Sequence, residues 1–359
     1  MCKRVLSYVF FSVLCALCLC ACGSSKEKIQ IALITDGGTI EDASYNQSAW
    51  EGIEKYALEH AKTYAYYQPK EPDTKEYLNS IKEAVKDGAG IIFCTSYLQE
   101  EAVYQAQEIY KKVSFVLIDG VPHDKDFSDY TIKSNTLSVQ FKEEEAGFLA
   151  GYAAVRDGNT SLGFMGGIPE ESIIRYGYGF VQGADYAAIE MGVNVTVNYC
   201  YTDTFFEDQS VTELAAKWYT EGVQVIFASG VEIGRSVMDA AEMIGLNCKV
   251  IGADVDQNEE SYTVLTSAMK MISNAAYNSL VAFDEGRFVG GQKYYYQASN
   301  QGVGLAMDQA RFQKFSTLEY DTIFTHLSDG TIVPYADVSV GTTDDLEFIN
   351  TTVTYVVME

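Results

Sequence analysis

Basic side chains are scarce in this sequence. Its 359 residues include 25 Lys and Arg against 50 Asp and Glu, which gives a formal net charge of −25 at pH 7. A surface of this sign repels phosphate groups, so a protein that binds nucleic acid non-specifically is excluded. Any anionic ligand would also need a local cation to offset the surrounding carboxylates.

Cysteine and histidine are too few and too scattered for a metal site. The sequence has three isolated histidines, and five of its eight cysteines lie within the first 22 residues. We interpret the remaining three as small buried side chains, because they are widely spaced in apolar runs and form no disulfide or metal-ligand pattern. They are Cys94, Cys200 and Cys248. P-loop motifs and nucleophile–base pairs are also absent, so we expect no cofactor.

A long apolar run occurs only near the N-terminus, from Val5 to Leu19. It is too short for a typical transmembrane helix and precedes small residues, as in a secretory signal peptide. It ends in Leu19-Cys-Ala-Cys22, which resembles the bacterial lipobox, in which cleavage leaves a lipid-modified cysteine at the mature N-terminus. We expect a lipoprotein signal peptide at 1–21, a lipid anchor on Cys22 and a linker at 22–28. The alternative is a plain signal peptide with incidental cysteines.

Past residue 28, short apolar runs alternate with amphipathic segments. This alternation predicts an α/β fold with parallel sheets covered by helices on both faces. The expected strands are 29–35, 63–67, 90–95 and 114–119, then 161–165, 194–200, 223–228, 249–252 and one beginning at 263–266. The expected helices are 47–60, 74–87, 100–110, 140–155, 176–191, 211–220, 234–244 and 269–285. Strand-like segments follow at 293–297, 304–307 and 331–333. The two series are similar in layout, which indicates two similar lobes.

The polar turn after the first expected strand, residues 36–52, is the strongest candidate for a ligand site. It runs from Asp36-Gly-Gly-Thr-Ile40 into a helical segment, and α/β folds bind ligands where parallel strands end in such turns. The free N–H groups of the helix start could face an anion or a polar ligand edge. Asp119, Gly230 and Asp254 also follow expected strands, so they are further candidates.

Five stretches, in order over most of residues 29–310, match the motifs of one family. They are Glu41-Asp-Ala-Ser-Tyr-Asn-Gln-Ser-Ala-Trp-Glu-Gly52; Gly166-Gly-Ile-Pro169 with Tyr176, Gly179-Phe180 and Gly183; Gly252-Ala-Asp-Val-Asp-Gln257; Leu265-Thr-Ser-Ala-Met-Lys270; and Gly302-Val-Gly304. As a set they resemble the basic membrane lipoproteins (BMP, PnrA-like). These are nucleoside-binding lipoproteins of ABC transporters with a periplasmic-binding-protein type I fold.

The resemblance implies two Rossmann-like lobes that hinge closed on a ligand in the cleft between them. We expect an N-terminal lobe of 29–134 plus about 266–303, and a C-terminal lobe of 135–265 plus about 304–359. The pattern is weakest after Met307. The implied partners are a nucleoside, with a purine nucleoside favoured, and the permease subunits with their ATPase. The implied location is the extracytoplasmic face of the cell membrane.

The resemblance also assigns roles around the nucleobase. Tyr45, where the family has Phe, would stack on the base from one lobe, and Tyr176 or Phe180 would stack from the other. Asp42 and Asn46 would read the base edge. Because Tyr45 and its neighbour Ala43 depart from the family motif, base preference is the least determined property.

The ribose would be bound by Asp119, Asp254 and Lys270, because hydrogen bonds between hydroxyls and charged groups are strong. Gly230 would allow close backbone approach. Other interpretations stay open: the tyrosines as interior aromatics, the two aspartates as turn or capping residues, and Lys270 as a solvated helix residue. Trp50 is expected in the core.

Three other functions remain as alternatives. A sugar-binding type I protein would use similar aromatic and carboxylate walls, and a sensor would present its ligand to a membrane receptor. An asparaginase-like amidohydrolase is suggested by Asp36-Gly-Gly-Thr-Ile40 and by Thr202-Asp-Thr204. The nucleophilic threonine expected before the glycine pair is replaced by Asp36, so we expect a binding protein and no enzyme.

Overall fold

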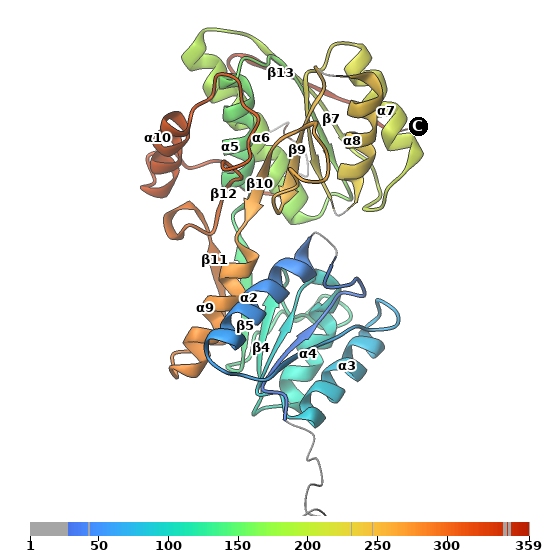
Figure 1. The fold of residues 1–359 in the computed structure, drawn as a ribbon, viewed down its shortest axis with the longest axis vertical. Coiled ribbons are helices and arrows are strands. Elements are labelled where there is room, and N and C mark those ends of the chain that lie inside the picture. Colours follow the sequence, from blue (N-terminus) through green and yellow to red (C-terminus); the bar gives the residue numbers. More distant parts are fainter. Residues whose placement is uncertain are drawn as a thin grey trace, which may run out of the picture.

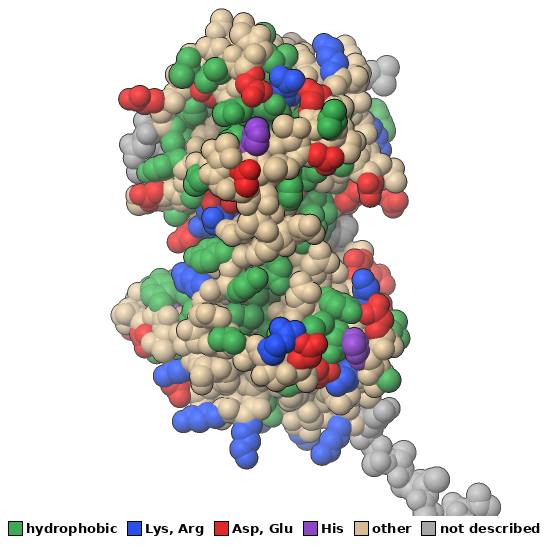
Figure 2. Space-filling model, turned by 90° about the vertical axis from the view of Figure 1, so that its left-hand side faces the viewer, with side chains coloured by type: hydrophobic (Ala, Val, Ile, Leu, Met, Phe, Trp, Pro, Cys, Tyr) green, Lys and Arg blue, Asp and Glu red, His purple; other side chains and the backbone are tan. Residues whose placement is uncertain are grey.

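The computed structural model describes residues 28–41, 44–230, 232–245, 247–339, 343 and 346–358. The expected signal peptide, Cys22 and Asp42 lie outside these residues. The described chain forms two α/β lobes, one above the other in Figure 1, each built on one sheet. Figure 2 shows them from the side as two rounded bodies joined by a narrower waist. None of the described helices is long and apolar enough to span a membrane.

The N-terminal lobe is built on a six-stranded sheet in the order β11-β5-β4-β3-β1-β2. All neighbouring pairs are parallel. Its strands are β1 (Ile31–Ile34), β2 (Tyr64–Tyr67), β3 (Ile91–Cys94), β4 (Ser114–Ile118), β5 (Thr136–Phe141) and β11 (Gln292–Tyr296). Its helices are α2 (Tyr45–Glu59), α3 (Thr74–Asp87), α4 (Glu100–Ile109) and α9 (Ile272–Asp284), with a short 3-10 turn at Tyr97–Gln99.

The C-terminal lobe is built on a seven-stranded sheet in the order β12-β10-β9-β8-β6-β7-β13, parallel except for the edge pair β10–β12. Its strands are β6 (Ser161–Gly166), β7 (Val195–Tyr201), β8 (Val225–Ser229), β9 (Lys249–Asp254), β10 (Val264–Lys270), β12 (Val303–Leu305) and β13 (Thr351–Tyr355). Its helices are α5 (Glu143–Arg156), α6 (Glu171–Met191), α7 (Gln209–Thr220), α8 (Ile233–Ile244) and α10 (Thr317–Ser328), and Ala298–Asn300 is a 3-10 turn. The expected fold class, two α/β lobes with parallel sheets flanked by helices, is confirmed.

The central strands are buried on both faces, which explains their apolar sequences. All four residues of β1 and of β3 are buried, as are all five of β8. Their side chains belong to continuous hydrophobic clusters that extend under the flanking helices.

The chain crosses between the lobes three times: between β5 and α5, between β10 and α9, and between β11 and β12. The crossing segments bond to one another, because the amide of Lys142 donates to Tyr296 O at 2.9 Å and that of Met271 donates to Gly302 O at 3.0 Å. The expected lobe boundaries were therefore wrong. Residues 136–141 belong to the N-terminal sheet, and residues 264–270 belong to the C-terminal sheet.

Several expected elements also differ from the structure. The helix expected from 140 begins at Glu143, and the one expected from 269 begins at Ile272, because a strand occupies each preceding segment. Residues 331–333 form no strand, whereas α10 and β13 were not expected. At both of these crossings the strand continues to the crossing, and the next helix begins two residues after the strand ends. No turn residues therefore mark the boundary between strand and helix in the sequence.

Helices α5 and α6 pack with their backbones in contact. Their facing positions carry glycine: a Cβ atom at Gly147 would overlap Tyr176 O, and one at Gly179 would overlap Glu144 O. Gly151 and Gly183 make the same close approach one turn further along each helix. This contact fixes the position of α6 relative to the lobe crossing that directly precedes α5. The N-terminal turn of α6 faces the cleft.

Candidate ligand-binding site

A cavity of about 350 Å³ lies between the lobes, at the carboxyl ends of strands from both sheets. This volume lies within the range of roughly 300–1,000 Å³ that is typical of small-molecule sites. From the N-terminal lobe it is lined by residues that follow β1, β3 and β4, including Asp36, Tyr97 and Asp119. From the C-terminal lobe it is lined by the start of α6 and by Phe205, Gly230 and Asp254.

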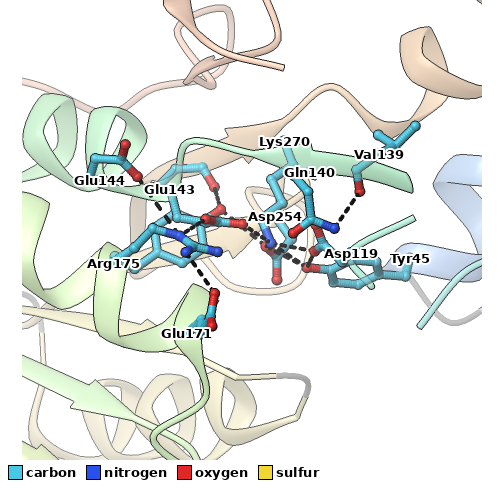
Figure 3. A network of polar contacts seen from close by, with 12 residues as sticks. Tyr45, Asp119, Val139, Gln140, Glu143, Glu144, Glu171, Arg175, Asp254 and Lys270 are labelled. Atoms are coloured by element: carbon cyan, nitrogen blue, oxygen red, sulfur yellow. Dashed lines mark hydrogen bonds and ion pairs between the residues drawn. The ribbon is translucent and has the colours of Figure 1, made fainter. Parts of the chain in front are cut away.

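The Tyr45 hydroxyl joins the two lobes at one end of this cavity. It donates to Oδ2 of Asp119 at 2.5 Å and lies 3.2 Å from Oδ1 of Asp254. Asp119 follows β4 of the N-terminal sheet, whereas Asp254 ends β9 of the C-terminal sheet. Figure 3 shows the tyrosine ring pointing into the group of charged side chains.

Lys270, the last residue of β10, lies at the centre of this group (Figure 3). Its ammonium group donates to the Tyr45 hydroxyl and to Asp119 Oδ2, both at 2.6 Å, and pairs with Glu143 at 3.0 Å. Asp254 lies 3.5 Å away. Burial lowers the pKa of Lys270, but the three carboxylates raise it by more, so its pKa lies well above the ordinary value. The residue is therefore a buried ammonium ion.

Glu143 connects this lysine to a second cation. Its Oε2 accepts from Nε of Arg175 on α6 at 2.7 Å, while its Oε1 faces Lys270. Glu143 is also the first residue of α5, where free N–H groups and the helix dipole favour a negative charge. Burial raises the pKa of Glu143, and the two cations lower it by more, so the side chain is a carboxylate.

Asp119 and Asp254 both adopt left-handed backbone conformations, with φ of 56° and 70°. Such conformations are unfavourable for most residues and often mark functional positions. The neighbouring strand β5 fixes the turn after Asp119, because Ser138 Oγ and Gln140 Nε2 both donate to Gly120 O, at 2.6 and 2.9 Å. The sheet therefore holds this carboxylate in the cleft at a local conformational cost.

Asn46 does not face the cavity as expected. Its side chain is fully buried, its amide donates to Asp36 Oδ1 at 2.8 Å, and its carbonyl oxygen accepts from Thr95 Oγ1 at 2.7 Å. Asp36 and Thr95 line the cavity themselves. Asn46 thus orients two lining residues, and Asp36 lines the cavity where Asn46 was expected to.

The two aromatic residues expected to stack from the C-terminal lobe do not line the cavity. Phe180 is fully buried between Phe164 and Phe227, so its assignment to the site is wrong. Tyr176 is 1% exposed, and its hydroxyl donates to Asp254 Oδ1 at 3.1 Å from behind the cavity wall. It supports the carboxylate and offers no face to a ligand.

Phe205, which the sequence did not single out, is the aromatic side chain that lines the cavity from the described part of the C-terminal lobe. It follows β7, and its ring rests on Gly167, where a Cβ atom would overlap it. Across the cleft its ring lies 6.5 Å from that of Tyr97, with the planes inclined by 60°. The glycine pair after β6 could have signalled this close packing, but nothing in the sequence indicated which ring it received.

Carboxylates outnumber cations on the cavity wall. The acidic lining residues are Asp36, Glu100, Asp119, Glu143, Glu170, Glu171 and Asp254. The basic ones are Arg175, Lys293 and His123, with Lys270 just behind the surface. The wall is therefore rich in hydrogen-bond acceptors and poor in positive charge. It suits a neutral or cationic ligand that carries several donors.

Two lobes, three crossings and a cleft at the strand ends define a periplasmic-binding-protein type I fold. Solved solute-binding proteins of ABC transporter systems share it. One from Aeropyrum pernix K1 has a TM-score of 0.72 and 19% identity, covering 88% of this chain and 96% of that chain. One from Conexibacter woesei DSM 14684 has a TM-score of 0.70 and 17% identity, covering 86% and 99%.

The model of the PnrA-like ABC transporter substrate-binding proteins (Bmp) matches residues 28–325, so the chain belongs to this family. The "ABC transporter nucleoside-binding protein BmpA" of Lactococcus lactis is 27% identical over 309 residues, covering 80% of this chain and 84% of that protein. "Basic membrane protein D" of Borreliella burgdorferi is 28% identical over 349 residues, covering 94% and 97%. The protein is thus a transporter's substrate-binding component, and the asparaginase-like alternative is wrong.

Proposed function

We propose that this protein is a lipid-anchored, extracytoplasmic binding protein that captures a nucleoside between its lobes and delivers it to ABC transporter permease subunits. A purine nucleoside is favoured, because two fused rings offer more stacking area than one. One observation carries the proposal: an acceptor-rich wall shared by both lobes lies in the same cavity as an aromatic pair.

The acceptor-rich wall fits the sugar of a nucleoside. The contacts of Asp119 use Oδ2 and those of Asp254 use Oδ1, so within the described residues the second oxygen of each carboxylate remains unbonded. Hydroxyls that donate to these two oxygens would form charge-assisted hydrogen bonds to both lobes at once. Gly230, which lines the same cavity with φ of 153°, leaves room for a ligand near the backbone.

The aromatic pair fits the base. Tyr97 is 39% exposed at the start of the 3-10 turn after β3, and it faces Phe205 across the cleft. Stacking on such a side chain contributes about 1–3 kcal/mol per base in single-strand binders. The Asp36 carboxylate lines the same cavity and could accept from a base amino or imino group. Asp42 stays a prediction for this edge.

The charge of the cavity favours a nucleoside over a nucleotide. A phosphate group would face the seven lining carboxylates, which outnumber the lining cations Arg175 and Lys293. Lys270 and Arg175 are also already paired with Asp119, Glu143 and Glu171. Repulsion between like charges in a partly buried site is costly. A neutral nucleoside avoids this repulsion while still providing hydroxyl donors.

The name of the Lactococcus relative, a nucleoside-binding protein, points in the same direction. A sugar-binding protein is the nearest rival, because the carboxylate wall alone would also suit a free sugar. It would leave the Tyr97–Phe205 pair without a planar partner, so response to the base separates the two functions.

Lobe closure would follow from the position of the ligand. A nucleoside can form hydrogen bonds to Asp119 on one lobe and to Asp254 on the other at the same time only when the lobes are closed. Its binding would therefore shift the open–closed equilibrium toward the closed form. The closed form is the state that we propose docks on the permease.

Thermal-shift titration with a ligand panel tests this proposal. The panel pairs ribo- and 2′-deoxyribonucleosides of all common bases with free ribose, arabinose and galactose. We expect stabilisation by at least one nucleoside and none by the free sugars at the same concentration. Asp254→Asn should weaken nucleoside binding by tenfold or more, because Asn keeps the left-handed backbone and removes the charge. Stabilisation by sugars with no response to any nucleoside would refute the proposal.

The lipid anchor rests on the sequence of residues 19–22 alone. Expression of the full chain in a bacterial host, followed by detergent phase partitioning, tests it. We expect the wild type in the detergent phase and Cys22→Ala in the aqueous phase. Equal partitioning of both proteins would contradict the anchor and leave ligand binding unaffected.

A further inference from the structure

The Tyr45 hydroxyl occupies a place that would otherwise suit a ligand hydroxyl. It lies between the carboxylates of Asp119 and Asp254 and the ammonium group of Lys270 (Figure 3). Asp119 directly follows β4, whereas Asp254 and Lys270 end β9 and β10, so the three partners come from three different strands and from both lobes. A site with acceptors on two sides and a donor on the third is matched by a hydroxyl, which donates once and accepts up to twice.

The Tyr45 hydroxyl already makes the contacts that this site offers. Its proton is donated to Asp119 at 2.5 Å, and its oxygen accepts from Lys270 at 2.6 Å. The ammonium group has further partners in Asp119 and Glu143, so its donors are also used. A ligand hydroxyl could enter this position only by displacing the tyrosine.

Displacement would be costly. Both short hydrogen bonds involve a charged partner and are therefore stronger than neutral ones. The ring of Tyr45 packs against the hydrophobic core, and the Lys270 ammonium group lies 5.2 Å from its centre. Removing the phenol would leave Asp119 and Lys270 without this partner until the ligand replaced it. The tyrosine therefore stays in place when a ligand binds.

We propose that Tyr45 fills one hydroxyl subsite of the cleft, so that the preferred ligand is a nucleoside with one hydroxyl fewer than a ribonucleoside. This inference rests on the proposed nucleoside function and makes the substrate class narrower.

The carboxylate oxygens that remain open beside the phenol agree with this proposal. Oδ1 of Asp119 and Oδ2 of Asp254 accept no hydrogen bond from the part of the chain that the structure describes. Each of these oxygens can accept a hydroxyl proton from a ligand between the lobes, so two ligand hydroxyls can be bound without the position that the phenol occupies. A 2′-deoxyribonucleoside carries two hydroxyls, whereas a ribonucleoside carries three, the third of which would compete with the phenol.

The test compares matched ligands on the wild-type protein and on one conservative variant. Dissociation constants are measured by calorimetry for a ribonucleoside and for its 2′-deoxy and 3′-deoxy forms. On the wild type, we expect at least one deoxy form to bind as tightly as the ribonucleoside or more tightly. Tyr45→Phe should shift the ratio of the two constants by at least tenfold in favour of the ribonucleoside, because the opened subsite then accepts its third hydroxyl.

Tyr56→Phe is the matched control. Tyr56 lies on the same helix, and its hydroxyl donates to Asp284 at 2.7 Å, away from the cavity. Its loss removes an equivalent tyrosine–aspartate hydrogen bond, so we expect an unchanged ratio. A wild type that prefers the ribonucleoside, with the same preference in Tyr45→Phe, would overturn the inference while the nucleoside function stands. Absence of binding by every nucleoside to both proteins would overturn the proposed function and the inference together.

Discussion

The ammonium group of Lys270 lies 2.6 Å from Oδ2 of Asp119, so a buried ion pair joins the C-terminal sheet to the N-terminal sheet. The lysine side chain is 1% exposed and the aspartate side chain 13%. The lysine lies directly before the second crossing of the chain between the lobes. The same pair that borders the ligand cavity therefore also stabilises the arrangement of the two lobes.

Lys270→Met should destabilise the protein strongly. The substitution leaves Asp119, Glu143 and Asp254 close together without their shared cation, and breaking a buried pair costs about 3–5 kcal/mol. Urea unfolding measures the loss. Lys62→Met is the control, because Lys62 pairs with Asp284 at the same 2.6 Å but is 26% exposed. Such an exposed pair contributes about 1 kcal/mol or less, so equal losses in the two variants would contradict the role of Lys270.

Glu144 should make the protein less stable as the pH rises. Burial, together with the charge of Glu143, raises the pKa of Glu144 from 4.5 to about 8, and its Oε2 has no hydrogen-bond partner among the described residues. Between these two values the folded state retains a proton that the unfolded state has released, so stability falls as the pH increases. Each unit of pKa shift corresponds to about 1.4 kcal/mol.

Glu144→Gln removes this titration, because the amide stays neutral at every pH. We expect the variant to gain stability relative to the wild type as the pH increases from 5 to 8.5, measured by urea unfolding at each pH. A difference that stays constant over this range would show that Glu144 does not titrate with a raised pKa.

Gly179→Ala should destabilise the contact between α5 and α6. The added methyl group would overlap the carbonyl oxygen of Glu144, which is backbone and cannot rotate away. Overpacking of this kind costs about 1–3 kcal/mol. Gly234→Ala on α8 is the control, because the nearest atom to its Cβ lies 3.6 Å away and alanine is the better helix former. Thermal unfolding should rank Gly179→Ala clearly below Gly234→Ala, and the reverse order would contradict the close packing.

Phe205→Ala should weaken nucleoside binding by about tenfold or more, because it removes one stacking face. Phe206→Ala is its matched control. The neighbouring Phe206 is 71% exposed and is not among the cavity-lining residues. Calorimetric titration with the best ligand of the panel gives both constants. Equal effects of the two substitutions would place the base elsewhere in the cavity.

Much of the fold could be predicted from the sequence, because apolar residues are nearly continuous in buried parallel strands but recur every three or four residues in amphipathic helices. The positions where the chain crosses between the lobes could not be predicted in this way. β5 and α5 are separated only by Lys142, and β10 and α9 only by Met271, so each strand merges with the next helix in the apolar pattern. α10 and β13 come after the last of the family motifs, in the part of the sequence where the pattern of apolar residues was weakest.

The candidate site was predictable only for residues that directly follow or end a strand. Asp119 and Asp254 come together at strand ends, as expected for ligand groups of parallel sheets. Lys270 ends β10, but the sequence pattern placed it in a helix, and only the family resemblance assigned it to the site. Tyr176 and Phe180 lie four residues apart on one face of α6, and their spacing cannot tell a face toward the core from one toward the cleft. Asn46 was misassigned because its partners, Asp36 and Thr95, are set by tertiary contacts.

The most direct test is one calorimetric comparison on the wild-type protein. It titrates the best-binding nucleoside of the panel, the 5′-monophosphate of the same nucleoside and the corresponding free sugar. An acidic cavity with an aromatic pair predicts that the nucleoside binds at least a hundredfold more tightly than the monophosphate or the sugar. Binding of the free sugar or the monophosphate as tightly as the nucleoside would contradict the proposed function.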